Sequence, residues 1–106
     1  MKLKEKIQFE NYLTSLGMIR SDMREWHFPD DIIHWNYFLV YERGNTFKVY
    51  MKSTPKKFED EYRIITTDWI NFTCDFENFK IYVNRAVDNY KNAIRQIKEL
   101  KAQEDF

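Results

Sequence analysis

Residues 35–52 read WNYFLVYERGNTFKVYMK, two runs of large side chains separated by Arg43-Gly44-Asn45-Thr46. Turn-forming residues between two runs that are rich in aromatic and β-branched side chains predict a β-hairpin. A loop of two residues or of four places Glu42 opposite Phe47, and the other pairs follow outward from there. A loop of three residues would mix apolar and polar side chains on both faces.

This pairing sorts the hairpin side chains onto two faces, because neighbours along a strand point in opposite directions. We expect the strands over residues 32–42 and 47–52. One face is apolar and holds Phe38, Val40, Phe47, Val49 and Met51. The other face collects amphipathic and basic side chains, namely Trp35, Tyr37, Leu39, Tyr41, Lys48, Tyr50 and Lys52.

Helical patterns flank the hairpin on both sides in the sequence. Near the N-terminus, apolar residues at helical spacing predict a helix over residues 4–16, ended by Gly17. From Asp75, a possible N-cap, to about residue 103, apolar residues alternate three and four apart and predict a long amphipathic helix. We expect its apolar stripe to cover the apolar face of the hairpin.

The remaining segments are predicted from turn and breaker residues. We expect residues 18–31 to form a loop with one helical turn and residues 53–61 a polar connection. Residues 62–67 are expected to form a third strand, and residues 69–74 fit either a strand or a helical turn. Together these elements predict an α+β fold in two layers, ordered αβββα, in a single domain of 106 residues.

The composition is that of a soluble globular chain, with 43% apolar and 32% charged residues. Seventeen cations balance 17 anions, so no global field favours nucleic acid or an anionic membrane. Cys74 is the single cysteine, which excludes an internal disulfide and fits a reducing compartment. No apolar run approaches a membrane span, and Met1-Lys2-Leu3-Lys4 lacks the apolar core of a signal peptide, so we expect a cytoplasmic protein.

The face that carries Trp35 and the tyrosines is the candidate binding surface. Tyr and Trp tolerate water on one side and a partner on the other, and they dominate interface hot spots. The predicted partner-binding residues are Trp35, Tyr37, Tyr41, Lys48, Tyr50 and Lys52. Two other interpretations stay open: the rings stabilise a wet sheet face by cross-strand contacts, or residues 18–31 fold over them.

Catalytic and metal-binding patterns are weak. In residues 27–34, HFPDDIIH, two histidines flank two aspartates, but the spacing suits ordinary loop and strand-edge residues better than metal ligands. Pro29-Asp30 begins a metal-dependent nuclease pattern, yet Thr46 stands where the second carboxylate would be needed. Cys74 lies among apolar residues and is expected to be buried and inert. We therefore expect no enzyme activity, no metal and no cofactor.

Two charged groups outside the hairpin are further candidates. On the long helix, Lys80, Lys91, Arg95 and Lys98 project in similar directions and form a basic strip that could meet phosphates. Glu59, Asp60, Glu61 and Asp68 are predicted to form an acidic patch able to imitate phosphates. Solvation of a helix face is the commoner explanation for the basic strip, and solubility of a loop is the simpler explanation for the acidic patch.

The long helix also suggests a homodimer. From Phe76 to Leu100 it would span about 37 Å, whereas a hairpin strand of seven or eight residues spans about 25 Å. The helix would then overhang its sheet and present a coiled-coil-like stripe to the first helix or to a second copy.

Two function classes follow. The first is a non-catalytic module that occludes a larger protein, such as a nucleic-acid-processing enzyme or its ribonucleoprotein complex; the second binds nucleic acid by stacking bases on the sheet-face rings. The αβββα order resembles the double-stranded-RNA-binding domain in topology, but the last helix opens with Asp75-Phe76-Glu77 rather than with lysines. The chain is small and rich in aromatic residues, has one cysteine, and favours residue types that are typical of AT-rich coding sequences. In these respects it resembles the inhibitors that phages and mobile elements direct against bacterial defence systems, including anti-CRISPR proteins. That resemblance of type implies steric occlusion or nucleic-acid mimicry.

Overall fold

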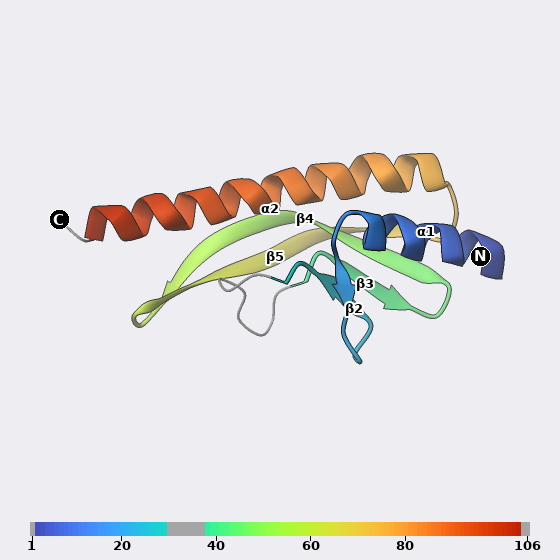
Figure 1. The fold of residues 1–106 in the computed structure, drawn as a ribbon, viewed down its shortest axis with the longest axis horizontal. Coiled ribbons are helices and arrows are strands. Elements are labelled where there is room, and N and C mark those ends of the chain that lie inside the picture. Colours follow the sequence, from blue (N-terminus) through green and yellow to red (C-terminus); the bar gives the residue numbers. More distant parts are fainter. Residues whose placement is uncertain (1, 30–37, 105–106) are drawn as a thin grey trace.

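The computed structural model describes residues 2–29 and 38–104. Its elements are α1 (Leu3–Ser15), β1 (Ile19–Arg20), β2 (Glu25–His27), β3 (Val40–Arg43), β4 (Thr46–Phe58), β5 (Glu61–Phe72) and α2 (Phe76–Glu104). The strands form one antiparallel sheet in the order β1-β2-β3-β4-β5 (Figure 1). The predicted α+β fold, with a helix at each end of the chain, is confirmed. Within these residues no helix is both long and apolar enough to cross a membrane.

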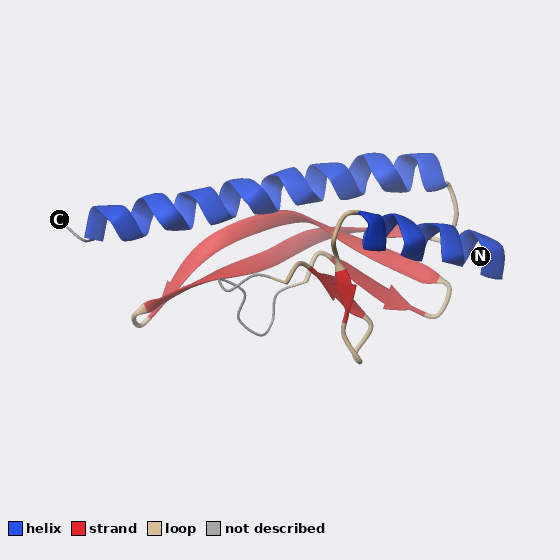
Figure 2. Cartoon of the chain, viewed as in Figure 1, coloured by secondary structure: helices blue, strands red, loops and turns tan. Residues whose placement is uncertain are grey.

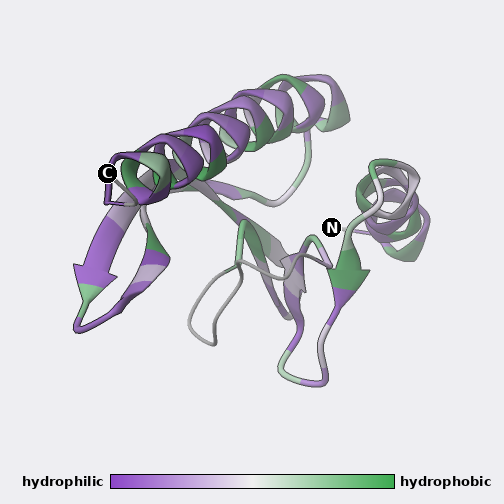
Figure 3. Ribbon diagram, turned by 60° about the vertical axis from the view of Figure 1, so that its left-hand side comes forward, coloured by the Kyte–Doolittle hydropathy of each residue, from purple (hydrophilic) through white to green (hydrophobic). Residues whose placement is uncertain are grey.

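Both helices pack on the same side of the sheet. Helix α2 runs along β4 for most of its length, and α1 lies beside the first part of α2 (Figures 1 and 2). Most apolar residues of α2 lie on the side of the helix that faces the sheet (Figure 3), as its three-four spacing predicts; Ile81 and Leu100 are exposed. The molecule is therefore a two-layer structure in which one sheet face is covered by helices.

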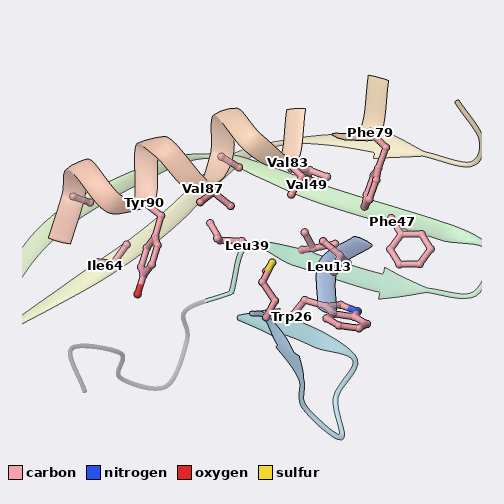
Figure 4. Close-up of a cluster of buried hydrophobic side chains, with 14 of the residues drawn as sticks. Leu13, Trp26, Leu39, Phe47, Val49, Ile64, Phe79, Val83, Val87 and Tyr90 are labelled. Carbon is pink, nitrogen blue, oxygen red and sulfur yellow. The ribbon is translucent and has the colours of Figure 1, made fainter. Parts of the chain in front are cut away.

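The core lies between this covered face and the two helices (Figure 4). Phe79 of α2 stacks on Phe9 of α1 at 4.1 Å between ring centroids, and Phe47 of β4 lies 5.1 Å from Phe9. These three rings are fully buried. They join both helices to the sheet and account for much of the apolar area removed from water.

The hairpin of β3 and β4 has the predicted register. Glu42 pairs with Phe47 and Val40 with Val49, around the two-residue turn Gly44-Asn45. Gly44 has a φ of +58°, a conformation that glycine adopts without steric cost. The turn chemistry therefore set the pairing as expected.

Just before β3, two residues point to the opposite faces from those predicted. Phe38 was expected to face inward and Leu39 outward; both expectations are wrong. Leu39 is fully buried, whereas the Phe38 ring packs edge-on against Tyr50 at 5.0 Å. Regular strand geometry begins only at Val40, so the alternation does not extend back to these two residues. Most of the predicted strand over residues 32–42 lies outside the described residues.

The loop with a helical turn predicted for residues 18–31 is also wrong where it is described. The chain forms β1 and β2, which add two short strands to the sheet. Met18 and Trp26 are buried in the core, and their burial stabilises this short hairpin. Ser21 begins the β-turn between these strands, and its hydroxyl accepts the Glu25 backbone N–H at 3.2 Å.

The polar connection predicted for residues 53–61 is wrong as well. β4 continues to Phe58, Glu59 and Asp60 form the turn, and β5 begins at Glu61. Past Val49, β4 has no further register pair with β3, and no described strand lies on that side of Pro55, a position at which a strand tolerates proline. The ambiguous segment 69–74 is strand as far as Phe72.

The predicted overhang of the long helix is wrong because the sheet is longer than expected. The 29 residues of α2 span about 43 Å, and the 13 residues of β4 span a similar distance of about 43 Å. At the far end, Glu104 accepts hydrogen bonds from Lys57 Nζ and from the Tyr62 hydroxyl, both at 2.6 Å. The argument for a homodimer through an unpaired end of α2 is thus lost, and dimerisation itself stays a prediction.

Candidate binding face

The sheet side opposite the helices is the open face, defined here by Glu25, Tyr41, Lys48, Tyr50, Lys52, Lys56, Arg63 and Trp69. Strand alternation places these side chains together, because their neighbours Val40, Val49 and Ile64 are buried on the covered face. Both helices lie on the other side, and no described element packs over this one (Figure 1).

The aromatic part of the open face lies where the sheet is widest. Tyr50 pairs directly with Trp69 across β4 and β5. The Phe38 ring meets Tyr50 edge-on at 5.0 Å and lies 6.0 Å from Tyr41. Trp69 keeps half of its surface exposed, far more than a core ring. The arrangement is a platform of rings held from below by the strands.

A polar row runs across the sheet beside this platform. By register, Glu25 pairs with Tyr41, Tyr41 with Lys48, and Lys48 with Asn71. The Lys48 ammonium lies 4.2 Å from the centre of the Trp69 ring, a cation–π contact that joins the row to the platform. Partial burial first, and then the nearby Tyr41 and Glu25, raise the pKa of Tyr50 above its ordinary value. The Tyr50 phenol is therefore neutral at physiological pH and can both donate and accept a hydrogen bond.

The two-stranded arm formed by the outer parts of β4 and β5 carries cations on the open face. Lys56 pairs with Arg63, and both lie over the Phe58 ring, at 5.2 Å and 5.0 Å. Arg63 also approaches Glu61 at 3.7 Å. The open face thus combines a ring platform with four cations, Lys48, Lys52, Lys56 and Arg63, against the carboxylates of Glu25 and Glu61.

The structure brings together four of the six predicted partner-binding residues, Tyr41, Lys48, Tyr50 and Lys52. Trp35 and Tyr37 lie outside the described residues. Sequence reasoning missed Trp69, Lys56 and Arg63 because it ended the strands too early. The alternation of polar and apolar residues in Glu61-Tyr62-Arg63-Ile64 was a signal for β5, whereas residues 53–58, STPKKF, show no such alternation.

The predicted acidic patch is not one cluster. Glu59 and Asp60 form the tip of the arm and Glu61 begins β5. Asp68 lies seven residues further along that strand, about 23 Å away at 3.3 Å per residue. It lines a cleft of about 330 Å³ between the sheet and α2, together with Asn89.

The predicted basic strip of α2 lies away from the open face. Lys91, Arg95 and Lys98 are exposed on α2, which packs on the covered side of the sheet. Lys80 is partly engaged, at 3.2 Å from Glu77 and 4.9 Å from the Phe76 ring centre. These cations therefore cannot extend the cationic arm of the open face.

The other chemical candidates remain isolated within the described residues. His27 is half-buried, and its Nδ1 lies 3.1 Å from the Phe28 carbonyl oxygen. His34, Asp30 and Asp31 fall outside the description. Cys74 is exposed, so the expectation that it is buried was wrong. No group of three His, Cys, Asp or Glu side chains capable of holding a metal occurs among residues 2–29 and 38–104.

A buried carboxylate that the sequence analysis missed supports the open face from below. The Glu42 side chain is fully buried, with Arg20 at 3.0 Å and Lys6 at 3.6 Å. Burial first, and then the neighbouring Glu42, raise the pKa of Glu10 in the same group. These charges tie α1 and β1 to β3. The predicted register placed Glu42 opposite Phe47 on an apolar face, which was the available signal.

Comparison with protein-family models, with curated proteins and with solved structures found no match. Function is therefore inferred from the chemistry of the open face.

Proposed function

We propose that the chain is a non-catalytic binding module whose open face holds single-stranded nucleic acid. The observation that carries this proposal is the placement of Tyr50 and Trp69, paired on adjacent strands, next to a line of cations on one uncovered sheet face. Such a combination of stacking rings and cations is how proteins bind single strands without reading every base.

The ring platform supplies the stacking surface. Base–aromatic stacking contributes about 1 to 3 kcal/mol per base, and a sheet holds rings at fixed positions without further ordering. Trp69 is half-exposed, while Tyr41 and Tyr50 are half-buried. Exposed bases of a single strand can reach these rings, whereas a double helix keeps its bases stacked internally.

The cationic arm supplies the contacts to phosphate. Lys52, Lys56 and Arg63 follow the platform along β4 and β5. Arg63 lies six positions before Trp69 on β5, about 20 Å away at 3.3 Å per residue. A backbone leaving the platform can run along this arm. The zero net charge supplies no global attraction for phosphate, so the proposal depends on the local line of Lys52, Lys56 and Arg63 on the open face.

The test compares two pairs of lysines. Lys52→Ala with Lys56→Ala removes charge from the open face, and Lys91→Ala with Lys98→Ala removes the same charge from α2. Binding of a labelled ten-nucleotide single strand is measured by fluorescence anisotropy at several salt concentrations. We expect the first pair to weaken binding and to lower the salt slope by about 0.7 for each lost phosphate contact. Equal loss in both pairs, or no binding by the wild type, would contradict the proposal.

A second candidate is a protein-binding inhibitor of the anti-defence type that the composition resembles. The observation that favours it is the Lys48 ammonium over Trp69, since it occupies one face of the ring that a base would need. Trp and Tyr anchors beside lysines also suit an acidic protein surface. In a pull-down, a stoichiometric protein partner that survives nuclease treatment and is lost with Trp69→Ala would favour this candidate.

A further inference from the structure

We infer that Glu25 gives the open face a preference for guanine among the bases that it stacks. This inference rests on the proposed binding of single strands and names the base that the platform selects. Glu25 lies at the end of the polar row, and phosphate binding by the cations gives its carboxylate no role.

The position of Glu25 is fixed by the backbone on both sides. Its N–H donates to the Ser21 hydroxyl at 3.2 Å, and its carbonyl oxygen accepts the Ser21 N–H at 2.9 Å. Across the sheet it pairs with Tyr41. The side chain therefore projects from a paired strand at the rim of the platform, and a group held in this way is suited to reading a ligand.

Among the described residues, no cation pairs with the Glu25 carboxylate, although cations lie elsewhere on the same face. Its charge is felt at the Tyr50 phenol, where it helps to raise the pKa. A carboxylate close to a stacking ring can thus meet the edge of a base lying on that ring.

The chemistry of base edges selects guanine. An ionised carboxylate only accepts hydrogen bonds, through two oxygens side by side. Guanine presents two neighbouring donors on its Watson–Crick edge, N1–H and the N2 amino group, which match those oxygens. Adenine and cytosine place an acceptor nitrogen beside their amino group, and thymine and uracil flank their N–H with carbonyl oxygens. A carboxylate repels these acceptors and the phosphates as well, which favours a path for the backbone along the cationic arm.

The experiment varies one chemical group in the strand, the N2 amino group of guanine, and one in the protein, the carboxylate of Glu25. Three single-stranded heptamers are used: seven thymidines, and the same strand with a central deoxyguanosine or deoxyinosine, which lacks the N2 amino group. Each is titrated against the wild type, Glu25→Gln and, as a control, Glu99→Gln on the exposed face of α2. Circular dichroism verifies that every variant is folded.

We expect the wild type and Glu99→Gln to bind the guanine strand about tenfold more tightly than the thymidine strand, as one bidentate contact provides. Deoxyinosine should lose most of that preference, and Glu25→Gln should bind all three strands within about threefold, by the same reasoning. Equal binding of all three strands by the wild type, or a guanine preference that survives Glu25→Gln, would overturn the inference and leave the proposed function standing. Absence of binding to every strand would overturn both.

Discussion

Val49 and Tyr50 are neighbours on β4, yet Val49 is fully buried beneath α2 whereas Tyr50 is half-buried on the opposite side of the sheet. The same contrast holds along the strand, where Phe47 is buried and Lys48 is not. The covered face packs against the helices, while no described helix or strand lies over the rings and charges of the open face. One strand thus provides both the stability of the fold and the surface available for binding.

The largest loss of stability is expected from a substitution on the covered face. Phe79→Ala removes a buried ring that packs against Phe9 at 4.1 Å and against Phe47 and Phe72 at 5.7 Å and 5.6 Å. We expect the free energy of unfolding to fall by about 3 to 5 kcal/mol, because transfer and cavity costs add. Urea denaturation followed by circular dichroism measures this loss. A loss under about 1 kcal/mol would mean that the ring is not part of a packed core.

The buried charges of the covered face come next. Arg20→Ala leaves the carboxylate of Glu42 buried with only Lys6 at 3.6 Å. We expect a loss of about 2 to 3 kcal/mol, less than for a fully buried pair because Arg20 is itself half-exposed. The double variant Arg20→Ala with Glu42→Gln should recover part of the loss. If the double variant is less stable than Arg20→Ala alone, the buried charge is not the cause.

On the open face the cost in stability should be small. Trp69→Ala removes a half-exposed ring whose contacts are the pairing with Tyr50 and the Lys48 ammonium. Cross-strand pairs of this kind contribute about 0.2 to 1 kcal/mol. Thermal unfolding should therefore move by only a few degrees while binding is lost. Global unfolding of this variant would show that the open face is part of the core.

The smallest effect concerns Glu10, whose pKa is raised by burial and by the neighbouring Glu42. A carboxyl group with a raised pKa in the folded state favours folding below its ordinary pKa and disfavours it as pH rises through the folded value. Glu10→Gln should therefore stabilise the protein slightly at pH 7, within about 0.5 kcal/mol. The difference from the wild type should shrink below pH 4. Destabilisation at pH 7 would instead give the larger weight to the contact of Glu10 with Arg20 at 3.8 Å.

The parts of the fold that the sequence predicts are those with strong local signals. Gly44-Asn45 determines a two-residue turn and with it the register of β3 and β4. The uninterrupted three-four spacing of α2 predicts both its length and its buried stripe. These features depend on neighbours in the chain, so they can be read without knowing the rest of the fold.

The missed parts depend on tertiary contacts. β1 and β2 have two and three residues, too few for any periodicity, and the burial of Trp26 stabilises them. The arm of β4 and β5 contains lysines and Pro55, which read as a loop until β5 pairs with them. Because that pairing also brings Lys56, Arg63 and Trp69 to the open face, these three of its eight residues could not be predicted from the hairpin alone.

The most direct test of the open face is a nuclear magnetic resonance titration of the isotope-labelled protein with an unlabelled single-stranded heptamer. The account predicts that the largest shift changes fall on Tyr41, Lys48, Tyr50 and Trp69, with smaller changes at Lys52 and Lys56 along the arm. Backbone signals of α2 should stay in place, because the helix lies on the other side of the sheet. Shift changes concentrated on Lys91, Arg95 and Lys98 of α2 would contradict the assignment of function to the open face. The absence of shift changes at a millimolar concentration of the heptamer would contradict it as well.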